Sequence, residues 1–421
     1  MPETQSLCHF PDVDLLRNLL ERNSNKVCVA LVLLSTLVAL GLSLASGNEL
    51  RYPDEQDYHA LAESLIAGKG YSTPEGIPTA YRPPGWPVVL SGIYRLSATP
   101  LIAKIFNALV YGLSAYLLSV LVGRIVREGR IVAPLLCAIY PLALYTSTTL
   151  YPQTLATGLL LAVLVLVGHT KADTRSLIMA GLLFGFSVLT VPAFLLVSPL
   201  MIPFFVRPTI QRLCLFACIA ALVVLPWTLR NTATLGGFTP VSTNSGINLL
   251  LGNSENTRPN SGVNIDYSHY LDATKGMTEK EQDTAFRNFA ITWITHHPGE
   301  AMTLYVQKVM NYFNYRNQLH VSAEGSSTRA LIVALSYYPL LLLALIRLFQ
   351  RKRFPLTRVE LGLYVLYFGN ACVSAIFFTR LRLRVPFDTL LIAIAAVTLG
   401  LALRHLLSST APHDSEPRHG T

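Results

Sequence analysis

Charged side chains are scarce in this sequence. Asp, Glu, Lys and Arg make up 14% of its 421 residues, whereas hydrophobic residues make up 52% and the mean hydropathy is +0.44. A soluble protein of this length would carry roughly a quarter charged residues. The deficit excludes an ordinary soluble domain and predicts a polytopic membrane protein, much of whose surface faces lipid.

Cysteine is also sparse, with six residues in the chain. All six lie in the N-terminal segment or in apolar runs, and the two longest polar segments, 49–99 and 230–328, contain none. No structural disulfide is therefore expected. Cys214 and Cys218 stand one helical turn apart, but they lie in an apolar run without His or carboxylate neighbours, which favours packing over metal binding.

The charge that is present is unbalanced, with 33 Lys and Arg against 24 Asp and Glu. A basic excess can indicate nucleic-acid binding, but basic residues that cluster beside apolar runs set membrane orientation instead. Here 17 of the 33 basic residues fall in links on one side of the predicted topology: 17–26, 124–130, 171–175, 207–212, 347–358 and 404–418. We expect no nucleic-acid partner, and both termini in the cytoplasm.

Seven long uncharged runs hold the predicted membrane spans: 27–48, 131–170, 176–206, 213–229, 330–346, 361–379 and 389–403. The run 131–170 is long enough for two spans of about 20 residues each, broken near the polar stretch 145–153. The run 176–206 fits one long tilted helix or two short helices broken near Pro192. Two helices keep the basic links on one side, so that a further span at 101–123 gives ten.

This topology divides the chain into five parts. Residues 1–26 are a cytoplasmic segment, 27–229 a first membrane module with the outer loop 48–99, 230–328 a large outer loop, 329–404 the C-terminal helices, and 405–421 a cytoplasmic tail. The apolar run that begins at residue 27 is too long for a cleavable signal peptide, so it is predicted to be the first anchor.

The first outer loop predicts a surface helix, because its apolar residues recur at helical spacing as far as Gly68 or Gly70. Asp54, Glu55 and Asp57 lie in or just before the first turn and are expected to face the outer surface of the membrane. Two interpretations stay open. The carboxylates cap and solvate the helix, or one is a general base while a neighbour helps to bind a divalent cation.

Arg380, Arg382 and Arg384 depart from the charge bias of the other links, because they lie in a short link on the outer side. Arginine presents a planar fork of donors that suits phosphate, and a lipid phosphate lies at the depth of such a link. The alternative is that these arginines pair with lipid headgroups or with Asp388 at the start of the last span. Phosphate binding is the favoured interpretation.

Acid on one outer loop and arginine on another suggest an enzyme that moves a group from a lipid phosphate carrier to a hydroxyl. At these positions the sequence resembles the GT-C glycosyltransferases, in the bacterial branch related to protein O-mannosyltransferases and lipid A aminoarabinose transferases (glycosyltransferase family 39-like). Four segments carry the resemblance: PDEQDYHALAESLIAGKGY with YRPPGWPVVL in the first outer loop, LPWTLRNTATLGGFTPVSTNSGINLLLGN at 225–253, TEKEQDTAFRNFAITWITHHPGEAMTLYVQK at 278–308, and RLRVPFD at 382–388.

The resemblance implies an all-α, GT-C-like bundle of about ten transmembrane helices, with a surface helix in the first outer loop and a small outer lobe. It also implies inverting transfer of a sugar from a polyprenyl-phosphate donor to a hydroxyl acceptor on a protein, a lipid or an envelope glycan. The expected location is the bacterial inner membrane, with the active site on the periplasmic side.

The resemblance assigns roles to particular residues. Asp54 is the expected general base, and Glu55 a second carboxylate. Whether Asp54 or Glu55 also binds a divalent cation, Mg²⁺ or Mn²⁺, stays open. The expected ligands of the donor phosphate are Arg380, Arg382, Arg384 and Arg82, and the candidate substrate contacts are Asp57, Tyr58, Tyr81, Asn244 and Lys308.

Two departures from the branch bear on these roles. Gln153 stands where many relatives have a glutamate, which weakens the case for a metal site built from that acid. Residues 189–192, Leu-Thr-Val-Pro, stand where relatives often have Thr-Arg-Pro, so that one basic contact is missing. Donor or acceptor is therefore expected to differ from the commoner members.

The main alternative function is a transporter or flippase of a lipid-linked sugar. Transporters place charged residues near the middle of the membrane, often in two related halves. In this sequence the charges gather outside the apolar runs and no halves repeat. A scaffold for an envelope complex is the third possibility, and we favour the enzyme over both.

Overall fold

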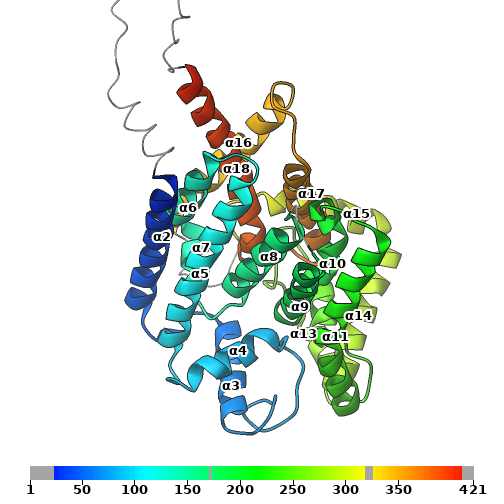
Figure 1. Cartoon of the computed structure of the whole chain (residues 1–421). Coiled ribbons are helices and arrows are strands. Elements are labelled where there is room, and N and C mark those ends of the chain that lie inside the picture. Colours follow the sequence, from blue (N-terminus) through cyan, green and yellow to red (C-terminus); the bar gives the residue numbers. More distant parts are fainter. Residues whose placement is uncertain (1–22, 170–172, 318–325, 410–421) are drawn as a thin grey trace, which may run out of the picture.

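The computed structural model describes residues 23–169, 173–317 and 326–409, which form an array of helices (Figure 1). In this part of the chain the only extended pairing is a single bridge between Ser72 and Pro78. The expectation of an all-α protein is confirmed.

The helices of the first membrane module bury apolar side chains against one another. Neighbours pack pairwise, α2 with α5 and α6, α5 with α8, α8 with α9, and α9 with α11. Their bounds are α2 (Ser24–Ser46), α5 (Pro100–Gly123), α6 (Gly129–Ile139), α7 (Pro141–Ser147), α8 (Gln153–Val167), α9 (Thr174–Thr190), α10 (Ala193–Val197), the 3₁₀ helix η1 (Ser198–Phe204) and α11 (Ile210–Leu235).

The C-terminal helices are α16 (Ser327–Gln350), α17 (Arg358–Ala375) and α18 (Leu381–Ser409). Helix α18 is the centre of the bundle, since it contacts α5, α6, α7, α8, α16 and α17. Every side chain from Leu390 to Val397 is buried. A helix that is apolar all round suits lipid as well as a packed interior, and α2 and α11 are as apolar as α18 but far more exposed. The central position of α18 therefore follows from its packing and not from its hydropathy.

Among the described residues, five helices are long and apolar enough to cross a membrane: α2, α5, α11, α16 and α18. The pair α6 and α7 adds a sixth span if it is counted as one, with a bend of 64°. The chain is a multi-pass membrane protein. The predicted number of ten spans is not confirmed, because several of the other runs form apolar helices shorter than 18 residues.

Both predicted breaks in the apolar runs are present. Helix α7 ends at Ser147 and α8 begins at Gln153, which leaves the polar stretch between them outside regular helix. Helix α9 ends at Thr190, directly before Val191 and Pro192. A proline disfavours helical geometry in the residue that precedes it, so two helices replace one long tilted helix.

The basic links at 124–130, 347–358 and 404–409 lie at one end of the bundle (Figure 1). Arg404 pairs with Glu128 at 2.9 Å, and Arg130 donates to the side chain of Asn25 at 2.6 Å. Helices α3 (Pro53–Ile66) and α4 (Gly85–Tyr94) lie at the other end, away from the C-terminal end of α18 (Figure 1). The positive-inside rule predicts that the end with these links faces the cytoplasm.

Helix α3 is the predicted surface helix. Pro53 occupies its first position, which suits the fixed backbone of proline, and Gly68 and Gly70 follow its end with φ of 73° and 75°. Tyr58, on the buried face of this helix, lies in one cluster with Tyr52, Trp86 and Leu150. The structure confirms this element close to its expected bounds.

Residues 236–317 form the small outer lobe, with helices α12 (Ser245–Gly252), α13 (Ser268–Ala273), α14 (Glu279–His296) and α15 (Pro298–Tyr312). Helix α14 packs on α12, and α15 continues from α14 to pack on α17. The start of α14 carries a capping box between Thr278 and Glu281, the local signal that ends a loop and begins a helix.

Candidate functional site

Asp54 lies at the second position of α3 with each carboxylate oxygen on a different arginine. Oδ1 is 2.6 Å from Nη2 of Arg82, and Oδ2 is 2.6 Å from Nη1 of Arg382. Arg82 comes from the segment between α3 and α4, whereas Arg382 comes from the first turn of α18. The fold therefore brings together three segments that are far apart in the sequence, as the predicted site requires.

The two arginines control the ionisation of Asp54. Burial disfavours the charged form, because the side chain is only 22% exposed. The charges of Arg382 and Arg82 outweigh this effect and hold the pKa of Asp54 below its ordinary value. The carboxylate is therefore ionised at neutral pH, as a general base requires.

Arg82 is held by more than Asp54. It also contacts Asp57, with Nη2 at 2.7 Å from Oδ2, and its guanidinium lies over the rings of Tyr58 and Tyr81. Tyr58 is buried beneath it and Tyr81 is exposed. The structure thus places Asp57, Tyr58 and Tyr81 beside Asp54, where the sequence predicted substrate contacts.

Arg382 rests on aromatic side chains. Its guanidinium lies 4.5 Å from the ring centre of Tyr151, which in turn stacks on Tyr52. Cation–π contact of this kind positions an arginine without using all of its hydrogen-bond donors. Sequence reasoning did not select Tyr151, although its position in the polar stretch between α7 and α8 was a signal.

Glu55 does not face the outer surface, which corrects the expectation for this residue. Its side chain is 1% exposed. The carboxylate accepts backbone N–H groups from Arg51 at 2.8 Å, Tyr52 at 3.1 Å and Leu150 at 2.8 Å. Glu55 therefore caps α3 and fixes it to the polar stretch before α8. These contacts give Glu55 a structural role, and they do not support the expected role as a second catalytic carboxylate.

The residues at this site do not fit a divalent cation. Both oxygens of Asp54 are taken by arginines and those of Glu55 by N–H groups. Within residues 23–169, 173–317 and 326–409, no three His, Cys, Asp or Glu side chains gather as a metal site. A cation site needs several free oxygen ligands, so the arrangement does not support metal binding by Asp54 or Glu55.

Arg384 is not placed to bind a donor phosphate, which corrects a second expectation. It is 1% exposed and pairs with Asp388 at 2.9 Å, while Asp388 also accepts the hydroxyl of Tyr140 at 2.6 Å. Nη1 of Arg384 donates to the backbone carbonyls of Tyr312 and Asn314. The alternative interpretation, pairing with Asp388, is right for this arginine.

The remaining candidates lie in other surroundings. Arg380 is half-buried and packs against Gly262 of the outer lobe. Lys308 is fully buried and donates to the carbonyls of Gly252 and Phe377, both at 2.8 Å, so it is a structural tie and the expectation of a substrate contact is wrong. Asn244 precedes α12 and accepts the hydroxyl of Ser242 at 2.9 Å.

Arg230 supports the site from α11, a role that sequence reasoning missed. It donates to the carbonyl of Thr79 at 2.7 Å and to that of Tyr71 at 2.8 Å. The hydroxyl of Tyr71 donates in turn to the carbonyl of Arg82 at 2.8 Å. Arg230 lies in the Arg-Asn motif of the second resembling segment, which was the available signal.

Comparison with known proteins agrees on the fold. No family model and no curated protein matches the sequence. An oligosaccharyltransferase from Archaeoglobus fulgidus, tethered with an acceptor peptide, aligns with 90% of this chain at a TM-score of 0.52 and 14% identity. The alignment covers 50% of that protein, so this chain spans about half its length.

Two crystal structures of ArnT from Cupriavidus metallidurans align less closely. The structure bound to undecaprenyl phosphate has a TM-score of 0.43 and 14% identity, over 89% of this chain and 78% of ArnT. The apo structure has a TM-score of 0.42 and 15% identity, over 90% and 76%. The likeness to the archaeal protein, at its higher score, shows that this chain shares the helical membrane fold of that protein.

Proposed function

We propose that this protein is an inverting glycosyltransferase that moves a sugar from a polyprenyl-phosphate donor to a hydroxyl acceptor, on the periplasmic side of a bacterial inner membrane. The observation that supports it is Asp54, ionised and held between Arg82 and Arg382. A base next to two phosphate-binding groups is the minimum set for this reaction. The GT-C fold is consistent with it.

The proposed reaction is a single displacement. Asp54 takes the proton of the acceptor hydroxyl while its oxygen attacks the anomeric carbon. The bond from that carbon to the phosphate oxygen breaks on the opposite face, and the lipid phosphate leaves with the electron pair. Inversion follows because the attack and the departure are on opposite faces.

Arg82 and Arg382 serve the leaving phosphate. Arginine binds phosphate through two parallel hydrogen bonds, so a donor phosphate competes with Asp54 for the same guanidinium groups. An arginine that moves from Asp54 to the phosphate raises the basicity of Asp54 at the moment when the donor is in place. Arg382 lies in the first turn of a membrane span, the depth at which a lipid phosphate is found.

Asp54→Asn tests the base. Asparagine keeps the size of the side chain but cannot take a proton, so we expect transfer to fall by at least about 100-fold. Cells that lack the gene receive the wild-type chain or this variant, and intact masses of their envelope lipids, glycans and proteins are compared. A mass increase that depends on Asp54 identifies the sugar and the acceptor.

Glu63→Gln is the matched control, because Glu63 is an exposed acid of the same helix and pairs with His59 rather than with an arginine of the site. We expect it to retain most of the activity. Transfer by Asp54→Asn above a tenth of the wild-type rate would remove Asp54 as the base. If the wild-type chain produces no mass change, the protein moves a lipid-linked sugar without transferring it, or does neither.

We further propose that transfer needs no divalent cation, since two guanidinium groups already carry the positive charge beside Asp54. EDTA added to the purified protein is expected to leave the transfer rate unchanged, because these guanidinium groups can neutralise the leaving phosphate without a metal. A loss of activity that Mg²⁺ or Mn²⁺ restores would contradict this proposal.

A further inference from the structure

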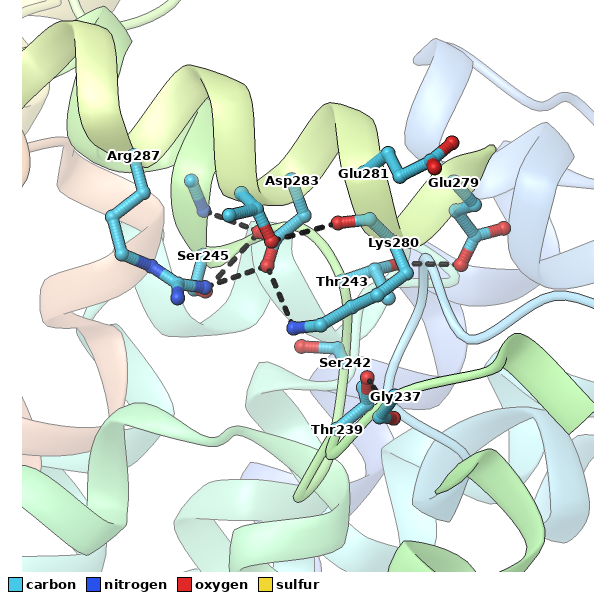
Figure 2. Close-up of polar contacts among 12 residues, drawn as sticks. Gly237, Thr239, Ser242, Thr243, Ser245, Glu279, Lys280, Glu281, Asp283 and Arg287 are labelled. Carbon is cyan, nitrogen blue, oxygen red and sulfur yellow. Dashed lines mark hydrogen bonds and ion pairs between the residues drawn. The ribbon is translucent and has the colours of Figure 1, made fainter. Parts of the chain in front are cut away.

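Glu279 extends from the outer lobe to the first outer loop. It is the first residue of α14, and its carboxylate accepts the hydroxyl of Thr79 at 2.6 Å and the N–H of Ala80 at 2.9 Å. It also accepts the hydroxyl of Thr243, which belongs to the outer lobe itself (Figure 2). Thr79, Ala80 and Thr243 are buried, so these contacts are shielded from water.

The segment that Glu279 holds carries Arg82. Both backbone groups of Ala80 are bound, since its N–H donates to Glu279 and its carbonyl accepts the N–H of Thr243 at 3.0 Å. Two residues later the side chain of Arg82 reaches Asp54. A short segment fixed this close to an arginine restricts where its guanidinium lies.

The other acids of α14 have different partners. Glu281 accepts the N–H and hydroxyl of Thr278, its own capping residue, at 2.9 and 2.8 Å. Asp283 joins α14 to α12, because it accepts the N–H of Gly246 at 2.6 Å. It also pairs at 2.6 Å with Arg287, which lies on α14 itself (Figure 2). Neither contact involves the first outer loop.

We propose that Glu279 is a positioning residue that keeps Arg82 on Asp54, so that the outer lobe sets the geometry of the site without supplying a reacting group. Its importance for transfer rests on the proposed function, but its effect on Asp54 does not. Asp283 fixes α14 on α12 and thereby gives Glu279 a rigid base from which to hold the loop.

Glu279→Ala and Glu281→Ala are the matched variants for the test. Both remove a carboxylate from the first turn of α14, and Glu281→Ala also removes the capping box with Thr278, but only Glu279 contacts the loop. Hydrogen exchange of the peptide 71–84 is expected to quicken in Glu279→Ala and to stay unchanged in Glu281→Ala. Glu279→Gln keeps an acceptor oxygen and is expected to be intermediate.

Titration of Asp54 gives a second measurement that is independent of activity. The charged groups that act on Asp54 are Arg382 and Arg82; Asp57 shares Arg82, and Tyr58, Tyr81 and Tyr151 are the titratable side chains around it. Arg82 favours the carboxylate, so an Arg82 that leaves Asp54 raises the midpoint of its titration. The midpoint is followed by the infrared carboxylic-acid band that Asp54→Asn removes. It is expected to rise in Glu279→Ala and not in Glu281→Ala.

Transfer completes the test. In Glu279→Ala we expect kcat/KM for the donor to fall about tenfold, with its acid limb moved to higher pH, while Glu281→Ala keeps both. An unchanged midpoint in Glu279→Ala, or equal shifts in the two variants, would overturn the positioning role. A shift confined to Glu279→Ala in a protein without transferase activity would leave this role in place and refute the proposed function instead.

Discussion

Arg382 and Arg384 are two residues apart, yet they have different surroundings. The side chain of Arg382 is 24% exposed and pairs with Asp54, whereas that of Arg384 is 1% exposed and pairs with Asp388. Residues two apart on a helix point to nearly opposite sides, because each residue turns the helix by about 100°. One arginine therefore faces the site and the other faces the interior of the bundle.

The two arginines are expected to respond differently to truncation. Arg382→Ala removes one of the two proposed phosphate ligands and should weaken the binding of undecaprenyl phosphate about tenfold with little change in Tm. Arg384→Ala leaves Asp388 buried without its cation, which costs about 3–5 kcal/mol. It should lower Tm strongly. Ligand binding and thermal unfolding of the purified variants provide both measurements.

The double variant Arg384→Met with Asp388→Leu is the control for Arg384. It replaces the buried pair with apolar side chains, and such replacements are often neutral for stability. If this double variant is stable and binds undecaprenyl phosphate normally, Arg384 is structural. A stable double variant with lost binding would instead return Arg384 to the phosphate site.

At the scale of single elements, α3 owes its position to its first turn. Glu55 satisfies N–H groups at the start of the helix and one beyond it, at Leu150. The polar stretch between α7 and α8, which contains Leu150, is also held by Asn107, whose side chain donates to the carbonyl of Thr149 at 2.8 Å. Asp54 is thus fixed to the membrane helices by the residue next to it.

Glu55→Ala tests this arrangement. The substitution leaves buried N–H groups without acceptors, at a cost of about 1–3 kcal/mol each, so we expect a lower Tm together with a lower kcat. Glu63→Ala, on the exposed face of the same helix, should change neither. A normal Tm with lost transfer would contradict the structural role and support a direct one for Glu55.

For the whole molecule, the basic links at 124–130, 347–358 and 404–409 and the acidic first turn of α3 lie at opposite ends of the bundle. From the positive-inside rule we predict that these links lie in the cytoplasm and Asp54 outside. Glu75 and Lys352 are exposed at these two ends. Each is replaced by Cys, as Glu75→Cys or Lys352→Cys, in a chain without its six native cysteines.

A membrane-impermeant maleimide should label the Glu75→Cys chain in spheroplasts and the Lys352→Cys chain only after the membrane is opened. The reason is that the reagent reaches thiols on the outer face alone. The opposite pattern would put Asp54 in the cytoplasm, away from a donor that is used outside. Equal labelling would show mixed orientation.

The sequence alone determined what depends on local and periodic features. Scarce charge and long apolar runs identified a membrane protein, and Pro192 marked the break after α9. The helical spacing after Pro53 identified α3. These features were predictable because hydropathy, proline geometry and helix capping act within a few residues of the sequence.

The tertiary structure decided which polar groups meet. Neighbouring acids took different roles, Asp54 on two arginines and Glu55 on backbone N–H groups. Arg382 and Arg384 also took different roles, since one pairs with Asp54 and the other with Asp388. Glu279 was joined to a loop about 200 residues away. Such pairings depend on how α3, α14 and α18 pack, and burial decides which charges need an internal partner. No local pattern in the sequence encodes that choice.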